Sequence, residues 1–155
     1  MKSKYIAALV LALAIPVNAQ AATFEVETPK EVTKAAEKWG EYYDICPELL
    51  ISICYEESRY ISDIVNKDSG CIGVMQIHKP SHKDRLKRLR ITDLTDIDQN
   101  IHVGADYLSE LFEEYEDVGV VLGKYHGEPT AETRISKYTK KVLKDSEQLE
   151  RLNGK

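Results

Sequence analysis

The sequence predicts one mainly α-helical domain with a single small β-hairpin or loop excursion. Apolar residues recur at helical spacing in several stretches, and glycines with β-favouring residues interrupt that pattern in "VNKDSGCIGVMQI", residues 65–77. The chain has 155 residues, which is enough for one domain with its own hydrophobic core. We find no internal repeat and no low-complexity segment in it.

The N-terminal segment has the pattern of a secretory signal peptide. Lys2 and Lys4 precede an apolar run over residues 6–17, and Ala19-Gln20-Ala21 is a small-x-small cleavage pattern. We expect a signal peptide at residues 1–21 and a domain at residues 22–155. The apolar run is short for a membrane span; an uncleaved N-terminal anchor is the alternative. The expected location is the periplasm, the cell wall or the extracellular space.

The charge balance argues against nucleic acid as a partner. The formal net charge is −5, and removing the two lysines of residues 1–21, which contain no acids, takes it to −7. An acidic chain is repelled by a phosphate backbone.

Three cysteines, Cys46, Cys54 and Cys71, permit one disulfide in an exported chain. If Cys46 and Cys54 share a helix, their separation is roughly 12 Å, which exceeds the roughly 7 Å that a disulfide spans. A bridge would therefore use Cys71, and the candidate pair is Cys54 with Cys71. Three free, buried cysteines are the alternative. The chain has no CxxC spacing, and we predict neither a metal nor a cofactor.

Two helices are predicted in the first half of the domain. Thr28 suits the N-cap of the first, Pro29 its first turn, and Glu31 completes a capping box. Its apolar stripe is Val32, Ala35, Ala36, Trp39 and Tyr43. The second helix begins at Pro47 and is expected to run to about residue 60. Gly70 and Gly73 then mark the tight loop or hairpin.

Four further helices, separated by turns, are expected in the second half. Residues 81–90 form a short basic helix, and residues 93–100 form a turn-rich connection. Asn100 is the expected cap of a third strong helix, whose stripe is Ile101, Gly104, Leu108, Leu111 and Tyr115. Residues 118–127 form a short apolar helix that ends in glycine. A final helix follows Pro129.

Two adjacent glutamates lie near the end of the second helix, in "CYEESRY". At about 100° per residue, Glu57 falls between Leu50 and Ile53, near the middle of the apolar face. Glu56 lies at the margin of that face and is expected to face solvent. A carboxylate on an apolar face is costly unless it is paired, neutral or in a cleft. Glu57 is therefore either a structural carboxylate satisfied by arginine or backbone donors, or a catalytic acid.

Four motifs occur in a fixed order. They are Glu57-Ser58 at a helix end, "GCIGVMQI" at residues 70–77, "NIHVGADYL" at residues 100–108, and Tyr125 in "GKYHG". Together they resemble the soluble lytic transglycosylases of the lysozyme superfamily over roughly residues 40–145. That family shows Glu-Ser, then Gly-x-x-Gly-Leu-Met-Gln-Ile, then Asn-Ile-x-x-Gly-x-x-Tyr-Leu, then Ala-Tyr-Asn. The resemblance implies a lysozyme-like α+β fold.

The resemblance also implies a site. Glu57 would be the catalytic acid/base, Ser58 would support it, and Gly73 would bring the loop backbone close to a ligand. Met75 and Gln76 would line the glycan cleft, since Gln offers both donor and acceptor and Met an adaptable apolar wall. Tyr125 would lie near the Glu57 carboxyl or the sugar.

The sequence departs from the family in three places. The asparagine after the motif tyrosine is His126, which either hydrogen-bonds substrate, with a charge that alters the pH profile, or is a surface turn residue. The motif leucine is Val74. Many members carry a glutamate before a Tyr-Val pair; aligning that pair on Tyr138-Thr139 puts Arg134 near its position, so we assign no such role.

The resemblance implies cleavage of the MurNAc–GlcNAc bond of peptidoglycan by one carboxylate, leaving 1,6-anhydroMurNAc ends. Lysozyme-type hydrolysis of the same bond is one alternative. An inactive glycan-binding or scaffold protein of an envelope-spanning apparatus is the other. The small domain suits a monomer that acts locally, beside a secretion, conjugation or sporulation apparatus.

Overall fold

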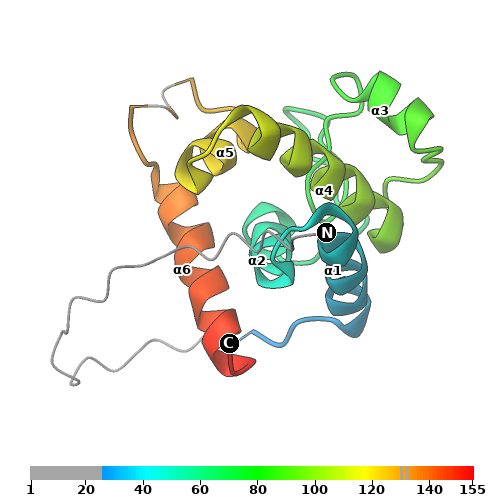
Figure 1. Cartoon of the computed structure of the whole chain (residues 1–155). Helices are drawn as coiled ribbons and strands as arrows, with labels where there is room; N and C mark the ends of the chain where they lie inside the picture. Colours follow the sequence, from blue (N-terminus) through cyan, green and yellow to red (C-terminus); the bar gives the residue numbers. More distant parts are fainter. Residues whose placement is uncertain (1–25, 130, 132) are drawn as a thin grey trace, which may run out of the picture.

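Six α-helices make up most of the described chain (Figure 1). The structure is a computed structural model, and it describes residues 26–129, 131 and 133–155. The predicted signal peptide, residues 1–21, lies outside these residues, as does the very start of the predicted domain. Within these ranges no helix is both long and apolar enough to cross a membrane. The helices are α1 Lys30–Tyr43, α2 Pro47–Ser58, α3 Lys83–Arg88, α4 Ile97–Glu114, α5 Val118–Tyr125 and α6 Lys137–Leu152.

Helix α2 lies at the centre of the molecule. In Figure 1 it is seen nearly end-on, with α1 on one side and α6 on the other, and it packs against both. Leu50, Ile53 and Cys54 are fully buried, and Leu49 and Ile51 on its other sides are nearly so. A helix that is apolar almost all round belongs in a core rather than at a surface. Only its last turn therefore brings polar side chains toward the outside.

Helices α1, α4, α5 and α6 form a ring around α2 (Figure 1). Helix α1 packs against α4, α4 against α5, and α5 against α6. The predicted cap of α4 is wrong: Asp96 caps it by accepting from the Gln99 N–H at 2.9 Å, and Asn100 lies inside the helix. The predicted cap of α1 is also wrong, because Pro29 occupies the cap position without a side-chain bond. Thr28 instead places its hydroxyl 3.4 Å from that of Tyr60.

A small lobe over residues 59–95 stands beside this ring of helices. Its β content is two isolated antiparallel bridges, Val65 with Ile72 and Ile72 with Ile77. Ile72 and Ile77 exchange both backbone hydrogen bonds, at 3.1 and 2.9 Å. The predicted hairpin is thus present at residues 72–77, as a single tight reversal. This reversal carries the glycine-rich motif.

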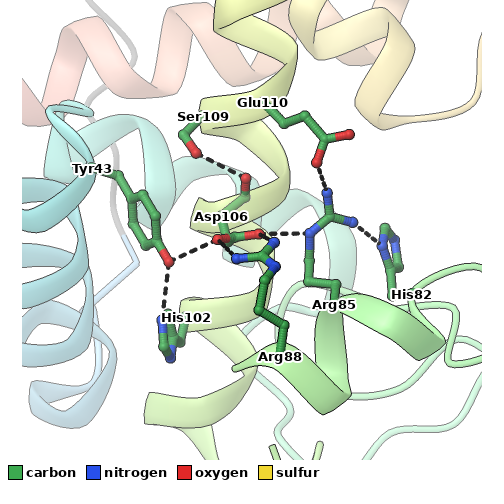
Figure 2. Close-up of polar contacts among 8 residues, drawn as sticks. All are labelled: Tyr43, His82, Arg85, Arg88, His102, Asp106, Ser109 and Glu110. Atoms are coloured by element: carbon green, nitrogen blue, oxygen red, sulfur yellow. Dashed lines mark hydrogen bonds and ion pairs between the residues drawn. The ribbon is translucent and has the colours of Figure 1, made fainter. Parts of the chain in front are cut away.

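A buried carboxylate joins the lobe to α4 (Figure 2). Asp106 accepts hydrogen bonds from Tyr43 of α1 at 3.0 Å, from Arg85 of α3 at 2.8 Å, and from both terminal nitrogens of Arg88. Burial alone would raise the pKa of Asp106, but these three donors lower it. Arg85 also pairs with Glu110. The cluster therefore fixes α3, and with it the lobe, against α4 and α1.

Candidate active site

Glu57 lies in the last turn of α2, where the helix leaves the core. The helix ends because Arg59 and Tyr60 both take positive φ, at 55° and 65°. The Ser58 hydroxyl donates to the carbonyls of Cys54, at 3.0 Å, and Val74, at 2.9 Å. The end of α2 is thereby tied to the glycine-rich reversal. The Glu57 side chain itself remains 13% exposed, so it is covered but reachable.

Tyr138 of α6 is the hydrogen-bond donor to Glu57. Its hydroxyl donates to Glu57 Oε1 at 2.7 Å. Burial, together with the negative charge of Glu57, raises the pKa of Tyr138. The hydroxyl therefore stays protonated and acts as a fixed donor. The sequence indicated Tyr138 only as part of the Tyr-Thr pair, so its hydrogen bond to Glu57 was missed.

His126 completes the immediate surroundings of Glu57. It follows the last residue of α5, and its ring stacks on that of Tyr138 with centroids 3.8 Å apart and an interplanar angle of 10°. Its Nδ1 lies 3.6 Å from Glu57 Oε1. The interaction with Glu57 outweighs partial burial and raises the pKa of His126. His126 therefore contacts both Glu57 and Tyr138, and its role toward substrate or in the pH profile stays a prediction.

Glu56 is not the solvent-facing residue that helical geometry predicted. Its side chain is 8% exposed and forms ion pairs with Lys141 Nζ at 2.6 Å and Arg59 Nη1 at 2.8 Å. Helix α6 covers this side of α2, which a one-helix projection does not show. Burial opposes ionisation, but the hydrogen bonds from Lys141 and Arg59 lower the pKa of Glu56. Its ion pairs thus favour the carboxylate form.

The reversal at residues 72–77 is clamped to α4 by Asn100. The Asn100 amide accepts from the Met75 N–H at 2.8 Å and donates to the carbonyls of Ile72 and Leu94, at 3.0 and 2.7 Å. Gly73 (φ +80°) leaves no room beside this amide, because a Cβ would stand 2.2 Å from Asn100 Nδ2. Asn100 thus supports the loop, whereas the sequence predicted that it caps the helix.

The loop residues differ in what they can offer a ligand. Gln76 is partly exposed, takes φ 49°, and uses one amide hydrogen on the Gly73 carbonyl at 3.0 Å. Met75 is fully buried and fills the space beside Gly104. Its side chain therefore supports the loop from behind and does not line a cleft as expected. Gly73 is buried too, so its part lies in the backbone turn.

Tyr125 and Ser58 also support the site from within. The Tyr125 hydroxyl donates to the Met75 carbonyl at 2.9 Å, and burial raises its pKa strongly. Ser58 is 5% exposed and spends its hydroxyl on backbone carbonyls. Both residues therefore join α2, α5 and the loop to one another. Neither offers its hydroxyl to a ligand in this arrangement.

The predicted disulfide between Cys54 and Cys71 is not present. All three cysteines are free thiols, with Cys54 fully buried in α2. Cys46 donates to Glu48 at 3.0 Å, and burial with that contact raises its pKa to about 12. The alternative of three free cysteines describes this structure, although Cys46 and Cys71 are only partly buried.

Neither histidine of the His-x-x-x-His spacing at residues 78 and 82 points to a metal. His78 Nδ1 lies 2.7 Å from the Ser81 hydroxyl, and His82 Nδ1 lies 2.5 Å from Arg85. Burial and the adjacent Arg85 lower the pKa of His82 to about 4. The part of the chain that the structure describes contains no cluster of three or more His, Cys, Asp or Glu side chains suited to a metal ion.

The family of the chain follows from its sequence. The profile of the Transglycosylase SLT domain matches residues 34–148, and the chain belongs to this family. The match spans all four motifs, so the family predicted from their order is confirmed. Members of this family are lytic transglycosylases and act on peptidoglycan outside the cytoplasm.

A solved structure shares the fold. It is an inactive glutamate-to-glutamine mutant of the lytic transglycosylase Slt from Pseudomonas aeruginosa. The TM-score is 0.68, with 19% identity over 81% of this chain and 25% of that one. The chain thus spans about a quarter of that protein. The predicted mainly α, lysozyme-like fold class is confirmed. A search of curated proteins gave no significant match.

Proposed function

We propose that the chain is an exported peptidoglycan lytic transglycosylase that uses Glu57 as its single acid/base. The observation that carries this proposal is the contrast between two adjacent carboxylates. Glu56 is neutralised by Lys141 and Arg59. Glu57 receives a neutral hydroxyl from Tyr138 and, among the described residues, pairs with no lysine or arginine. Of the two, Glu57 is therefore the one that no lysine or arginine of the described residues holds in an ion pair.

The arrangement suits a mechanism with one carboxylate. Glycosidases that use two need the second as nucleophile or base, and the nearest candidate, Glu56, is held by its cations. Both polar contacts of Glu57 within the described chain use Oε1. Oε2 is then the oxygen that exchanges a proton with the substrate, while the hydrogen bond from Tyr138 fixes the plane of the carboxyl group.

The proposed reaction has two steps. The Glu57 carboxyl gives its proton to the oxygen of the MurNAc–GlcNAc bond, and the bond from that oxygen to the MurNAc anomeric carbon breaks. The MurNAc N-acetyl oxygen bonds to the anomeric carbon meanwhile. The Glu57 carboxylate then takes the proton of the MurNAc C6 hydroxyl, whose oxygen displaces the N-acetyl oxygen. The product is a 1,6-anhydro sugar, and no water is consumed.

The loop opposite Glu57 supports the same proposal. Gln76 lies at the partly exposed end of the reversal that Ser58 ties to α2. Its free amide atoms suit an acetamido group of the glycan. Export through residues 1–21, action as a monomer and work beside an envelope-spanning apparatus belong to the same proposal.

The test compares the wild-type protein with Glu57→Gln on purified peptidoglycan. We expect release of muropeptides with 1,6-anhydroMurNAc ends, measured by mass spectrometry, and loss of at least about a thousandfold in Glu57→Gln because glutamine cannot donate the proton. Glu41→Gln, an exposed position on α1, is the matched control. Reducing MurNAc ends would establish a hydrolase instead. Equal lysis by Glu57→Gln would refute the assignment, and binding without lysis by the wild type would indicate a scaffold.

A further inference from the structure

The two adjacent glutamates of α2 contact the same face of α6, one turn apart. Glu57 Oε1 accepts from the Tyr138 hydroxyl at 2.7 Å, and Glu56 Oε1 pairs with Lys141 Nζ at 2.6 Å. Tyr138 and Lys141 differ by three positions, so they are neighbours on one side of a helix. Helix α6 is thus held to the end of α2 at two points, one neutral and one charged.

The ion pair between Glu56 and Lys141 has one further charged partner on each helix. On α2, Arg59 pairs with Glu56 at 2.8 Å; on α6, Asp145 pairs with Lys141 at 2.9 Å. The carboxylate side chains of Glu56 and Asp145 are only 8% and 9% exposed. Both cations bind the same oxygen, Glu56 Oε1, and Asp145 supplies a second carboxylate to Lys141. The side chains of Arg59 and Lys141 are 51% and 48% exposed, so water screens these pairs in part, but less than it screens a pair that is exposed on both sides.

The aromatic ring of Tyr55 lies beneath both cations. The guanidinium of Arg59 stands 4.1 Å from its centroid, and the ammonium of Lys141 stands 5.4 Å from it. A ring face attracts cations, so Lys141 is restrained from two directions. The ammonium therefore has a fixed place relative to α2, and α6 is fixed with it.

We infer that Glu56 and Lys141 are positioning residues for the proposed reaction. Their ion pair sets the register of α6 on α2, so that the Tyr138 hydroxyl meets Glu57 Oε1 and leaves Oε2 for the substrate. A slip of one residue would move the hydroxyl by about 1.5 Å and turn it by about 100°. Misplacement on this scale is enough to reduce catalysis markedly. The inference rests on the proposed function of Glu57.

The kinetic test uses Lys141→Met, which keeps the stem and removes the charge. We expect kcat to fall about tenfold in Lys141→Met and in Tyr138→Phe, since each loses the hydrogen bond to a charged group, with KM little changed. The kcat of the double variant, with both Lys141→Met and Tyr138→Phe, should be no lower than that of the slower single variant. Lys141→Arg should recover most of the rate. Lys140→Met, an exposed neighbour on α6, should match the wild type.

A second measurement separates this inference from the proposed function. By NMR, the Tyr138 hydroxyl proton, identified by its loss in Tyr138→Phe, should be protected from exchange in the wild type and in Lys141→Arg. It should be lost in Lys141→Met. If it persists in Lys141→Met, or if kcat of that variant is unchanged, the positioning role is refuted. If Glu57→Gln stays active, the proposed function fails, yet the hydroxyl signal still decides whether Lys141 positions Tyr138.

Discussion

Asn100 Oδ1 accepts a 2.8 Å hydrogen bond from the backbone N–H of Met75, while its Nδ2 donates to the carbonyls of Ile72, in the same reversal, and of Leu94, in the connection before α4. One fully buried amide thus fixes the reversal that Ser58 ties to the end of α2. Its position leaves space for a hydrogen atom alone at Gly73, which explains why that residue is glycine.

The first prediction concerns this contact. Gly73→Ala should destabilise the protein by more than about 3 kcal/mol, because the new methyl would overlap the Asn100 amide and the Leu94 carbonyl in addition to the strain of positive φ. Gly70→Ala is the control: Gly70 also has positive φ, but a Cβ there meets nothing within 4 Å. It should cost only about 1 kcal/mol. Urea unfolding of both variants measures the difference; equal costs would contradict the prediction.

The second prediction concerns the Asp106 cluster shown in Figure 2. Asp106→Ala should lower the free energy of unfolding by about 3 kcal/mol, because it leaves Arg85, with a side chain only 10% exposed, without its buried partner. Arg88→Met should cost less than about 1 kcal/mol, since the Arg88 side chain is 58% exposed. Thermal or urea unfolding measures both losses of stability. A larger loss in Arg88→Met than in Asp106→Ala would contradict the prediction.

The third prediction concerns the charge on His126. Its pKa is raised by Glu57, so the imidazole should titrate above 6.5 in an NMR experiment and should return toward 6.5 in Glu57→Gln. The stabilisation from this pair is complete below the unfolded pKa of about 6.5 and is lost as pH rises through the folded pKa. Relative to His126→Asn, the wild type should therefore lose stability on going to alkaline pH. An unchanged difference between the two proteins across that range would contradict the contact.

The fourth prediction concerns acid stability. Glu48 is 2% exposed; burial alone would raise its pKa, but hydrogen bonds from Lys155, Asn153 and Cys46 lower it to about 2. A lowered pKa contributes stability that is present above about pH 4.5 and is lost toward pH 2. We expect about 1–2 kcal/mol, reduced by the exposure of Lys155.

Glu48→Gln provides the comparison for this prediction. The wild type should be the more stable protein at pH 6, and the two should converge near pH 2 in urea unfolding experiments. Parallel stability curves over this range would show that Glu48 is not the titrating group.

The sequence predicted the fold class and the family well, because both depend on local signals. Helical periodicity gave α1, α2, α4 and α6, and the order of four motifs gave the family. The errors at Thr28 and Asn100 are also local: each residue suits a helix cap, but tertiary partners took its side chain. Capping preference is a weak signal beside a buried hydrogen-bond network.

The parts that sequence could not supply depend on pairs of helices. A projection of α2 alone placed Glu56 at an exposed margin, yet α6 covers it with Lys141. Nothing in the spacing of Tyr138 distinguishes a core residue from a donor to Glu57. The prediction that Met75 lines the cleft failed for the same reason, because its side chain packs against Gly104 of α4.

Glu57 and Tyr138 are separated by 81 positions, and the second of them belongs to the last helix of the described chain. A ribosome makes α2 well before α6, and domains fold as their segments become available. A nascent or prematurely terminated chain therefore carries the reactive glutamate without the tyrosine that orients it. For a protein proposed to cut the wall of a cell, this order of synthesis delays competence until α6 has been made.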